Sequence, residues 1–375
     1  MRSVGVEEEL LLVDADSGAP RAVSGAVLAA ADRSAWQGKE ADGGGGPREE
    51  HAFEEELQKE QLEFATAPVT EMGELQEEII RIRGEAARHA ATVGAKVAAV
   101  ATSPLSVRPS LSVSPRYQWL GKQFGLLAQE QLTCGCHVHV SVASDEEGVA
   151  VLDRIRPWLP VLMAMSANSP FWQGEDTGYD GYRSRVWNRW PSAGAYEVFG
   201  SADRYHEQVR AMIDTGVLRD EGMIYFDARL SATYPTVEIR VADVCLDPST
   251  PVLLAALARG LVETAARAWE EGVPPARVGT GLLRLASWRA GRSGLDGPLL
   301  HPETLQETSA EHAVMALYQH VREALVDHGE DEWVREGIAH LHERGTGARV
   351  QRRLFASEGS LAAVVTGCAE ITVAS

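Results

Sequence analysis

The chain has 375 residues, 45% of them hydrophobic and 24% charged, which is enough for one large globular domain or two smaller ones. Its formal net charge is −19, from 54 acidic and 35 basic side chains, so it would repel a phosphate backbone, and nucleic acid is not an expected partner. No apolar run is long enough to cross a bilayer and none precedes Glu7, so we expect neither a membrane partner nor a secretory signal. The four scattered cysteines are too few for a disulfide framework, which indicates a reduced, cytoplasmic protein.

Strands and helices alternate through the first third of the chain. Residues 3–13 are predicted to form a strand that ends in a turn at 14–18, where the residues bond their own backbone or accept positive φ. Next come a short helix capped by Ser24, two extended segments and a long helix. A buried strand follows, although its alanines are equally compatible with a continued helix. These elements are expected at 24–33, 51–57, 61–67, 70–93 and 96–102, with a flexible glycine loop at 43–46.

The rest of the chain is predicted to be mostly helical. Strands are expected at 133–142, 223–230 and 236–241, the last two forming an antiparallel pair. Helices are expected at 115–132, from 145 to about 168, and at 202–215, 251–271, 275–290, 302–326, 330–343 and 346–356. No repeat or interdomain linker is visible, so we expect a single domain over residues 1–375.

Residues 168–200 differ from the rest of the chain in their aromatic and arginine content. A loop this long inside a compact domain is usually functional or disordered, and aromatic side chains argue against disorder. We therefore expect an ordered or closing lid that carries positive charge. Its main side chains are Trp172, Trp187, Trp190, Tyr179, Tyr182, Arg183, Arg185 and Arg189.

The predicted strand at 133–142 has two chemically different faces, because successive side chains of a strand point to opposite sides. One face carries the polar, ligand-capable residues Gly135, His137, His139 and Ser141. The other carries cysteines and valines. A polar face backed by an apolar one indicates that a site is built on this sheet.

Three other predicted strands repeat this design, with Glu7 and Glu9, with Glu63, and with Glu238 and Arg240 on their polar faces. If these faces meet in one curved antiparallel sheet, carboxylates and imidazoles converge. Mg²⁺ and Mn²⁺ prefer oxygen ligands with an occasional imidazole. Clustered carboxylates are costly without cations, so a metal ion together with a phosphate ligand would neutralise them.

Each part of this pattern also has a simpler interpretation. A lone HxH pair is more often solvated or hydrogen-bonded than ligating, and the acidic run at 7–9 could be an exposed patch. Glu238 and Arg240 could form an ion pair on a sheet. The arginines of 183–189 could belong to a solvated loop. A zinc site from Cys134 and Cys136 with the two histidines is opposed by strand parity, which turns the cysteines away. No phosphate loop, dinucleotide fingerprint or nucleophile elbow occurs, so a bound nucleotide would be held through metals and arginines.

Taken in order, five motifs resemble those of the glutamate–cysteine ligase type 2 family, a group of carboxylate–amine ligases. They lie at 5–10, 62–66, 134–140, 183–194 and 238–240, and the resemblance extends from Val4 to about Arg353. It implies an α+β fold similar to glutamine synthetase, in which a curved antiparallel sheet carries the active site and helices surround it. It also implies that a carboxylate, typically the γ-carboxylate of glutamate, takes the γ-phosphoryl of ATP, and that an amine, typically that of cysteine, attacks the acyl phosphate.

The resemblance also implies roles for individual residues. Arg240 would bind phosphate or a substrate carboxylate, and Arg183 and Arg185 would close over the phosphates. His139 and Arg189 would line the nucleotide or substrate pocket. The implied ligands of Mg²⁺ or Mn²⁺ are Glu7, Glu9, Glu63, His137 and Glu238, with Glu56 as a further candidate.

The substrates and the activity class have alternatives at this point. Fold and site do not fix the substrate, so the same ligase chemistry could act on another acid or amine. A metal-dependent hydrolase would turn over without nucleotide, and a catalytically silent protein would bind nucleotide without turnover. The C-terminal helices could form a homodimer face, although packing within one domain would satisfy the same periodicity.

Overall fold

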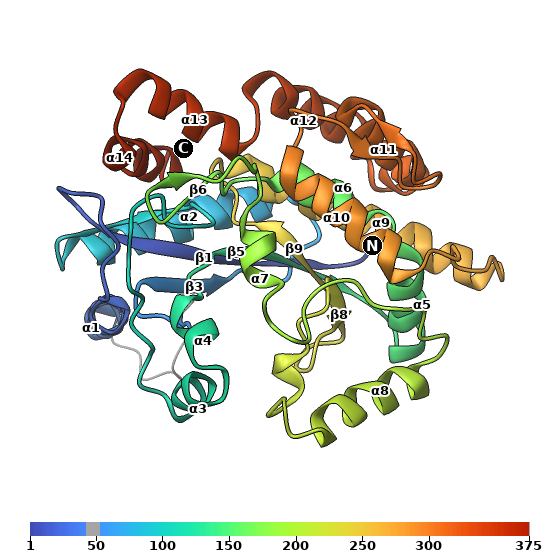
Figure 1. The fold of residues 1–375 in the computed structure, drawn as a ribbon, viewed down its shortest axis with the longest axis horizontal. Helices are drawn as coiled ribbons and strands as arrows, with labels where there is room; N and C mark the ends of the chain where they lie inside the picture. Colours follow the sequence, from blue (N-terminus) through green and yellow to red (C-terminus); the bar gives the residue numbers. More distant parts are fainter. Residues whose placement is uncertain (43–52, 375) are drawn as a thin grey trace.

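The computed structural model describes residues 1–42 and 53–374, and a twisted sheet runs through its middle (Figure 1). Within the described residues the sheet has seven strands in the order β2-β3-β1-β5-β9-β8, and β4 also pairs with β1. Every pairing in it is antiparallel. The strands are β1 (Val4–Asp14), β2 (Phe53–Glu55), β3 (Gln61–Ala65), β4 (Ala95–Ala98), β5 (Gly135–Ser141), β8 (Ala228–Leu230) and β9 (Thr236–Asp243).

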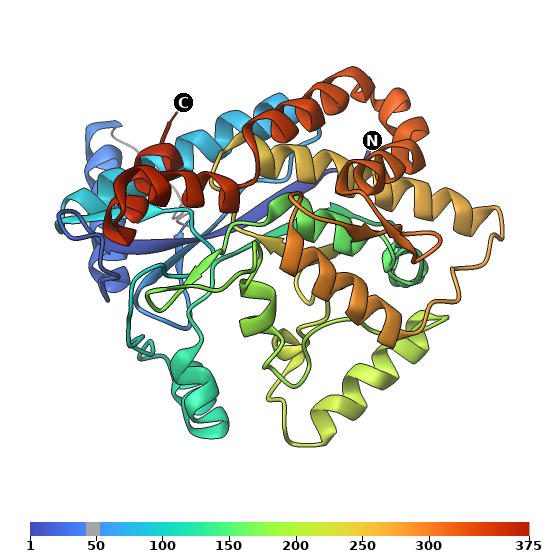
Figure 2. The same cartoon turned by 45° about the horizontal axis from the view of Figure 1, so that its top comes forward.

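Helices cover the sheet from both sides. In Figures 1 and 2, α2, α9 and α11 to α14 lie on one side, and α3, α4 and α8 lie on the other. The expected α+β class, with an antiparallel sheet surrounded by helices, is thus confirmed. The helices are α1 (Ser24–Asp42), α2 (Met72–Ala91), α3 (Pro115–Phe124), α4 (Leu126–Glu130), α5 (Asp145–Ile155), α6 (Leu159–Ser166), α7 (Arg183–Trp187), α8 (Ala202–Asp214), α9 (Ser249–Glu270), α10 (Thr280–Ser293), α11 (Ala310–His328), α12 (Asp331–Arg344), α13 (Gly347–Glu358) and α14 (Leu361–Thr372).

Several short elements complete the chain. A 3-10 turn, η1, covers Glu221–Met223. Two small hairpins join β6 (Phe171–Trp172) to β7 (Glu175–Asp176) and β10 (Leu299–Leu300) to β11 (Glu307–Thr308). Among the described residues, no helix is both long enough and apolar enough to pass through a bilayer.

Most predicted elements are confirmed, including the strand alternative in the first part of 96–102, but three helical predictions are wrong in extent and one helix was not predicted. The helix expected at 115–132 breaks at Gly125, whose φ of 55° no continuous helix allows. The helix expected from 145 to 168 is interrupted around Pro157, because a proline has no backbone N–H to continue the helical hydrogen bonds. The helix at 302–326 starts only at Ala310, after the β10–β11 hairpin, and α14 was not predicted.

The first helix, α1, starts at the predicted residue but differs from the prediction in its end and its cap. The helix begins at Ser24 and extends past Arg33 to Asp42, and the Ser24 hydroxyl has no hydrogen-bond partner, so it does not cap the helix. The glycine loop predicted at 43–46 lies outside the described residues.

The face of β1 that points away from the predicted site is buried against helices. Val4 and Val6 are almost fully buried there, and α9 packs on β1 and β5. Because the valines are buried on this face, the residues that alternate with them must point to the other face, and the orientation of the strand is fixed.

A fully buried ion pair continues this face where the valines end. Arg83 of α2 donates to both carboxylate oxygens of Glu8, at 2.8 and 2.7 Å, and neither side chain is exposed. The same guanidinium donates to the carbonyls of Cys245 at 2.6 Å and Leu246 at 3.1 Å. One side chain therefore ties α2, β1 and the segment after β9 together.

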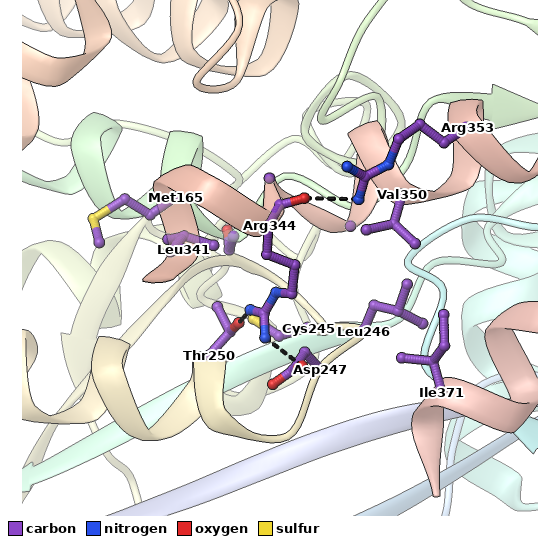
Figure 3. Close-up of a pocket in the computed structure, with 13 residues that line it drawn as sticks. Met165, Cys245, Leu246, Asp247, Thr250, Leu341, Arg344, Val350, Arg353 and Ile371 are labelled. Carbon is purple, nitrogen blue, oxygen red and sulfur yellow. Dashed lines mark hydrogen bonds and ion pairs between the residues drawn. The ribbon is translucent and has the colours of Figure 1, made fainter. Parts of the chain in front are cut away.

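A cavity of about 290 Å³ lies between the segment after β9 and helices α12 to α14 (Figure 3). Figure 3 shows the Arg344 side chain reaching to Asp247 and Thr250, and the distance from its Nη2 to the Thr250 Oγ1 is 2.7 Å. Arg353 donates to the Arg344 carbonyl at 2.7 Å, at the end of α12. The Arg344 guanidinium therefore holds the end of α12 against the segment after β9, and the Arg353 guanidinium joins α13 to α12.

We expect Arg83→Leu to lower the free energy of unfolding by about 3–5 kcal/mol, because Glu8 would stay buried without its partner. Urea-induced unfolding measures the loss. The double variant Glu8→Leu/Arg83→Leu should lose clearly less than the sum of the two single variants, since no uncompensated charge remains. Additive losses would contradict the view that the two charges stabilise each other.

Candidate active site

The pairing register of the sheet brings the predicted acidic and histidine side chains together. Glu7 lies opposite His137 on the neighbouring strand β5. On its other side, β1 pairs Glu9 with Glu63 of β3. Since paired residues of an antiparallel ladder point to the same face, these groups share one side of the sheet.

A β-bulge shapes the contribution of β9. Cys136 pairs with Ala242 but Val138 pairs with Ile239, so two residues of β9, Arg240 and Val241, stand opposite His137. The carboxylate of Glu238 accepts hydrogen bonds from Arg240 and from Arg229, the latter at 2.7 Å. Two guanidinium groups therefore hold this carboxylate in place.

The two histidines of β5 share the carboxylate of Glu7. The Glu7 Oε2 lies 3.2 Å from the His137 Nδ1, and its Oε1 lies 3.1 Å from the His139 Nε2. The His139 Nδ1 is 2.9 Å from the hydroxyl of Thr236. His137 also lies 3.9 Å from Glu238, so the HxH strand joins the acid of β1 to the acid of β9.

Two of the acids are held in the charged form. Burial alone would raise the pKa of Glu7, but hydrogen bonds from His137 and His139 overcome it and lower this pKa. Burial likewise opposes ionisation of Glu238, but the charges of Arg240 and Arg229 lower its pKa to about 2. The acids next to β5 and β9 are therefore anionic at neutral pH.

Three other acids of the cluster, on β1, β3 and the segment after β2, have raised pKa values. Burial and then the charges of Glu56 and Glu9 raise the pKa of Glu63 well above its usual range. Burial and the charge of Glu56 raise the pKa of Glu9 to about 7, although Arg183 opposes this. Burial also raises the pKa of Glu56. Burial and mutual repulsion thus oppose the charge of these carboxyl groups, and a bound cation would offset that repulsion.

The chemistry of this donor set fits a hard divalent cation. Two groups of three residues place their ligand atoms within 4.8 Å of one another, and His137 belongs to both of them. Burial and the charge of Arg240 lower the pKa of His137 to about 4, which keeps the imidazole neutral as a ligand must be, and its Nε2 has no hydrogen-bond partner. The groups are Glu7 with His137 and Glu238, and Glu9 with Glu63 and His137. Oxygen ligands with one imidazole suit Mg²⁺ or Mn²⁺.

No cysteine enters these two groups within the described part of the chain. Cys134 and Cys136 are buried as free thiols, so the arrangement does not support the zinc alternative. Glu56 belongs to neither group, but it borders the same cavity.

The cluster forms one wall of a cavity of about 190 Å³. Aromatic rings form another wall, where Trp187 lies under the guanidinium groups of Arg183 and Arg240, at 5.5 and 5.8 Å from the ring centre. The cavity is lined by Glu7, Glu9, Glu56, Leu57, Gln61, Glu63, Arg116, Tyr117, Leu120, Gln131, Thr133, His137, Trp187, Trp190, Gly222, Tyr225, Arg229 and Arg240.

The three arginines predicted from the segment 168–200 lie in different places. Arg183 is buried beside Gly135 at the edge of the cluster, and its backbone N–H donates to Ser169 at 2.9 Å. Arg185 does not border the cavity, and Arg189 is exposed and ion-paired with Glu130 at 2.9 Å. Only the first of the three therefore adds charge directly to the cluster.

The segment 168–200 is ordered and anchored, in agreement with the ordered alternative of the prediction. Arg352 of α13 forms ion pairs with Asp176 and Asp180. The backbone of Gly181 donates to the carbonyl of Gly291 in α10 at 2.8 Å. These contacts hold α7 and Trp187 next to the site.

Sequence reasoning missed several residues of the cavity, among them Arg229, Arg116, Gln131 and Tyr225. Arg229 had a usable signal, because the predicted β8–β9 pair places it opposite Glu238. The others come from α3, from loops and from the segment before β8, where no periodic pattern indicates what a side chain faces.

Comparisons with known proteins place the chain in a family. A family model described as glutamate–cysteine ligase family 2 matches residues 3–367. The chain is 59% identical over 372 residues to "Putative glutamate–cysteine ligase 2-1" of Streptomyces avermitilis, with 99% of both chains covered. It is 58% identical over 376 residues to "Putative glutamate–cysteine ligase 2" of Streptomyces coelicolor, with 100% of both covered.

Solved structures show the same fold at low sequence identity. The glutamate–cysteine ligase of Francisella tularensis in complex with AMP has a TM-score of 0.69 at 12% identity, covering 100% of this chain and 89% of that one. A bifunctional glutathione synthetase of Pasteurella multocida has a TM-score of 0.66 at 15% identity, covering 99% of this chain and 52% of that one. The arrangement of sheet and helices is therefore that of known ligases.

Without a divalent cation, we expect the melting temperature to fall as the pH rises from 5 to 8. The folded state keeps a proton on Glu9 up to a pKa of about 7, well above the ordinary value of 4.5. Its contribution to stability is therefore complete below pH 4.5 and is lost as the pH rises through about 7. Thermal scans at several pH values, with and without MgCl₂, measure this.

Mg²⁺ should replace the protons and reduce that loss, whereas Glu9→Gln should show a shallower fall with pH than the wild type. An equal fall in both proteins, unaffected by Mg²⁺, would show that the carboxylate cluster does not set this pH dependence.

Gly135→Ala should weaken Mg²⁺ binding by about 10- to 100-fold, a loss typical of changes next to a ligand set. The added methyl group would overlap the guanidinium of Arg183 and lie 3.1 Å from the His137 Nε2, next to the N–H that donates to Glu9. Isothermal titration calorimetry measures the affinity. Gly5→Ala is the matched control on β1, since its methyl group would have its nearest neighbour at 3.9 Å; equal affinities in both variants would contradict the expectation.

Proposed function

Since the chain belongs to glutamate–cysteine ligase family 2 and is an ATP-dependent carboxylate–amine ligase, we propose that it joins the γ-carboxylate of glutamate to the amine of cysteine. The observation that carries this proposal is the carboxylate–histidine cluster on β1, β3, β5 and β9 beside a cavity with arginines on its walls. Phosphoryl transfer asks a protein mainly for positioning and for neutralisation of charge, which such a cluster supplies.

The proposed reaction has two steps. The γ-carboxylate of glutamate attacks the γ-phosphorus of ATP, so that the bond to the β-phosphate oxygen breaks and ADP leaves. The amine of cysteine then attacks the acyl phosphate, phosphate leaves with the electron pair of the C–O bond, the amine gives up one proton, and an amide forms. Water would destroy the acyl phosphate, so a closed cavity favours the second step.

We propose that Glu7, Glu9, Glu63, His137 and Glu238, assisted by Glu56, hold Mg²⁺ or Mn²⁺. The cation would neutralise phosphate charge and orient the nucleotide. Arg240 and Arg183 would stabilise the charge of the transferred group, and His139, whose Nε2 lies 3.1 Å from the Glu7 Oε1, would keep Glu7 in position. Arg185 and Arg189 lie outside the cavity, so their proposed contacts with phosphate or substrate require the segment 168–200 to move inward when ATP binds.

We further propose that residues 1–375 form one catalytic unit that works in the cytoplasm, where ATP and reduced thiols are available. All four cysteines are free, which agrees with a reducing compartment. A homodimer stays a prediction.

The test is phosphate release from ATP with Mg²⁺ and glutamate, with single amino acids and amines added in turn. We expect release to depend on cysteine, and Glu63→Gln to lower it by about 100-fold or more, because the cluster loses a proposed ligand. Glu74→Gln, in the first turn of α2 and exposed, is the control and should keep wild-type activity.

Each other result would revise one part of the proposal. Release with a different amine would keep the ligase and replace cysteine as acceptor. Release without any amine, or turnover of an amide without ATP, would favour a hydrolase. Nucleotide binding without turnover in the wild type would favour a silent binding protein.

A further inference from the structure

One buried polar side chain of the cavity has no role in the proposed metal and phosphate chemistry. Gln131 follows α4 and precedes β5, borders the cavity and is only 3% exposed. Its Nε2 donates to the hydroxyl of Thr133 at 2.7 Å. Its Oε1 has no hydrogen-bond partner among the described residues.

The surroundings of this oxygen form an uncharged polar end of the cavity. Gln61 and Thr133 line the same end, and the Gln61 Nε2 donates to the Thr133 carbonyl at 2.9 Å. Gln61 lies two residues before Glu63 on the same face of β3, so this end begins where the carboxylate cluster stops. The aromatic side chains and Arg116, Arg229 and Arg240 also line the cavity, but none of them bonds to Gln131.

The chemistry of this end selects a hydrogen-bond donor. A buried carbonyl oxygen without a partner is unfavourable, and a ligand N–H removes that cost. The carboxyl groups of Glu9 and Glu63 line the same cavity and offer further oxygen acceptors to a donor. ATP and the acid substrate are anionic, so the amine is the component of the reaction that fits.

We propose that the amide oxygen of Gln131 binds and orients the amine substrate, an inference that rests on the proposed ligase function. The amide is a neutral acceptor, so it holds the amine through a hydrogen bond without the full charge that would keep an ammonium protonated. The amine must lose its proton before it attacks the acyl phosphate. A glutamine therefore suits this position better than a further glutamate.

The experiment compares steady-state kinetics of wild type and Gln131→Leu, with ATP, glutamate and the amine that the wild type accepts in the phosphate-release screen. We expect the KM for the amine to rise by about 10- to 100-fold, as for loss of one hydrogen bond to a polar or charged ligand group. The KM values for ATP and glutamate should stay within about twofold. The phosphate released per amide formed should rise, because acyl phosphate that is not trapped by amine reacts with water.

Two glutamines of the same region serve as controls. Gln58 is fully buried and its Oε1 also lacks a partner, but it does not border the cavity. Gln129 is exposed on α4, two residues before Gln131. Gln58→Leu reports the effect of replacing a buried glutamine as such, and neither control should raise the KM for the amine.

The outcomes separate this inference from the ligase function. A wild type without amine-dependent turnover overturns the proposed function and this inference with it. An active wild type whose amine KM is unchanged in Gln131→Leu overturns this inference alone, as does a larger effect on the KM for glutamate. If Gln131→Leu does not fold, Gln131→Asn is used for the same measurement, since it keeps the amide group but shortens the side chain by one methylene. An unchanged KM for the amine in this variant would again overturn the inference.

Discussion

Five carboxyl groups and one imidazole share a space too small and too dry for all of the acids to be charged together. The protein resolves this conflict by dividing the cluster. Glu7 and Glu238 are anionic because histidines and arginines stand next to them. Glu9, Glu56 and Glu63 have raised pKa values because burial and mutual repulsion oppose their charge. His137 lies between the two halves and belongs to both ligand groups, so it joins acids with lowered pKa values to acids with raised pKa values.

This division requires strands that do not move, and the opposite face of the sheet supplies the rigidity. The two acids of β1 that face the cavity flank Glu8, whose carboxylate is fixed from behind by Arg83. The same guanidinium holds the segment that leaves β9. A shift of β1 relative to β9 could relax the repulsion among the carboxyl groups on the cavity side of the sheet. It would, however, break a buried ion pair and several hydrogen bonds on the opposite side, and breaking a buried ion pair strongly destabilises a protein.

Sequence alone could predict the chemistry of this face but not its assembly. Strand parity correctly puts Glu7, Glu63 and His137 on polar faces, because a period of two survives any tertiary arrangement. The register that pairs Glu9 with Glu63 and the bulge that sets Arg240 opposite His137 depend on contacts between segments far apart in the chain. The burial of Arg183 could not be foreseen either, since it follows from hydrogen bonds and packing of the segment around Ser169.

Helix boundaries failed where a single backbone conformation overrides apolar periodicity. The break at Gly125 results from its positive φ, and the late start of α11 results from a hairpin whose Leu305 also has a positive φ of 56°. Hydrophobic spacing contains no information about such turns. The consequence for function is direct, since the break at Gly125 separates α3, which contributes Arg116 and Tyr117 to the cavity, from α4, which leads into Gln131.

The two kinds of wall determine different aspects of the activity. The sheet contributes charged groups that any phosphoryl transfer to a carboxylate can use, whereas α3, α7 and the segment before β8 contribute the shape that selects a substrate. The three arginines that line the cavity are already engaged, Arg116 by Asp220, and Arg229 and Arg240 by Glu238. An anionic substrate must therefore compete with Glu238 for Arg229 and Arg240. If the Glu238 carboxylate binds a metal cation instead, these two guanidinium groups become free to bind phosphate. Charge balance thus makes the binding of a cation and the binding of an anion depend on each other in this cavity. The selection of the substrate then depends on the walls formed by α3, α7 and the segment before β8.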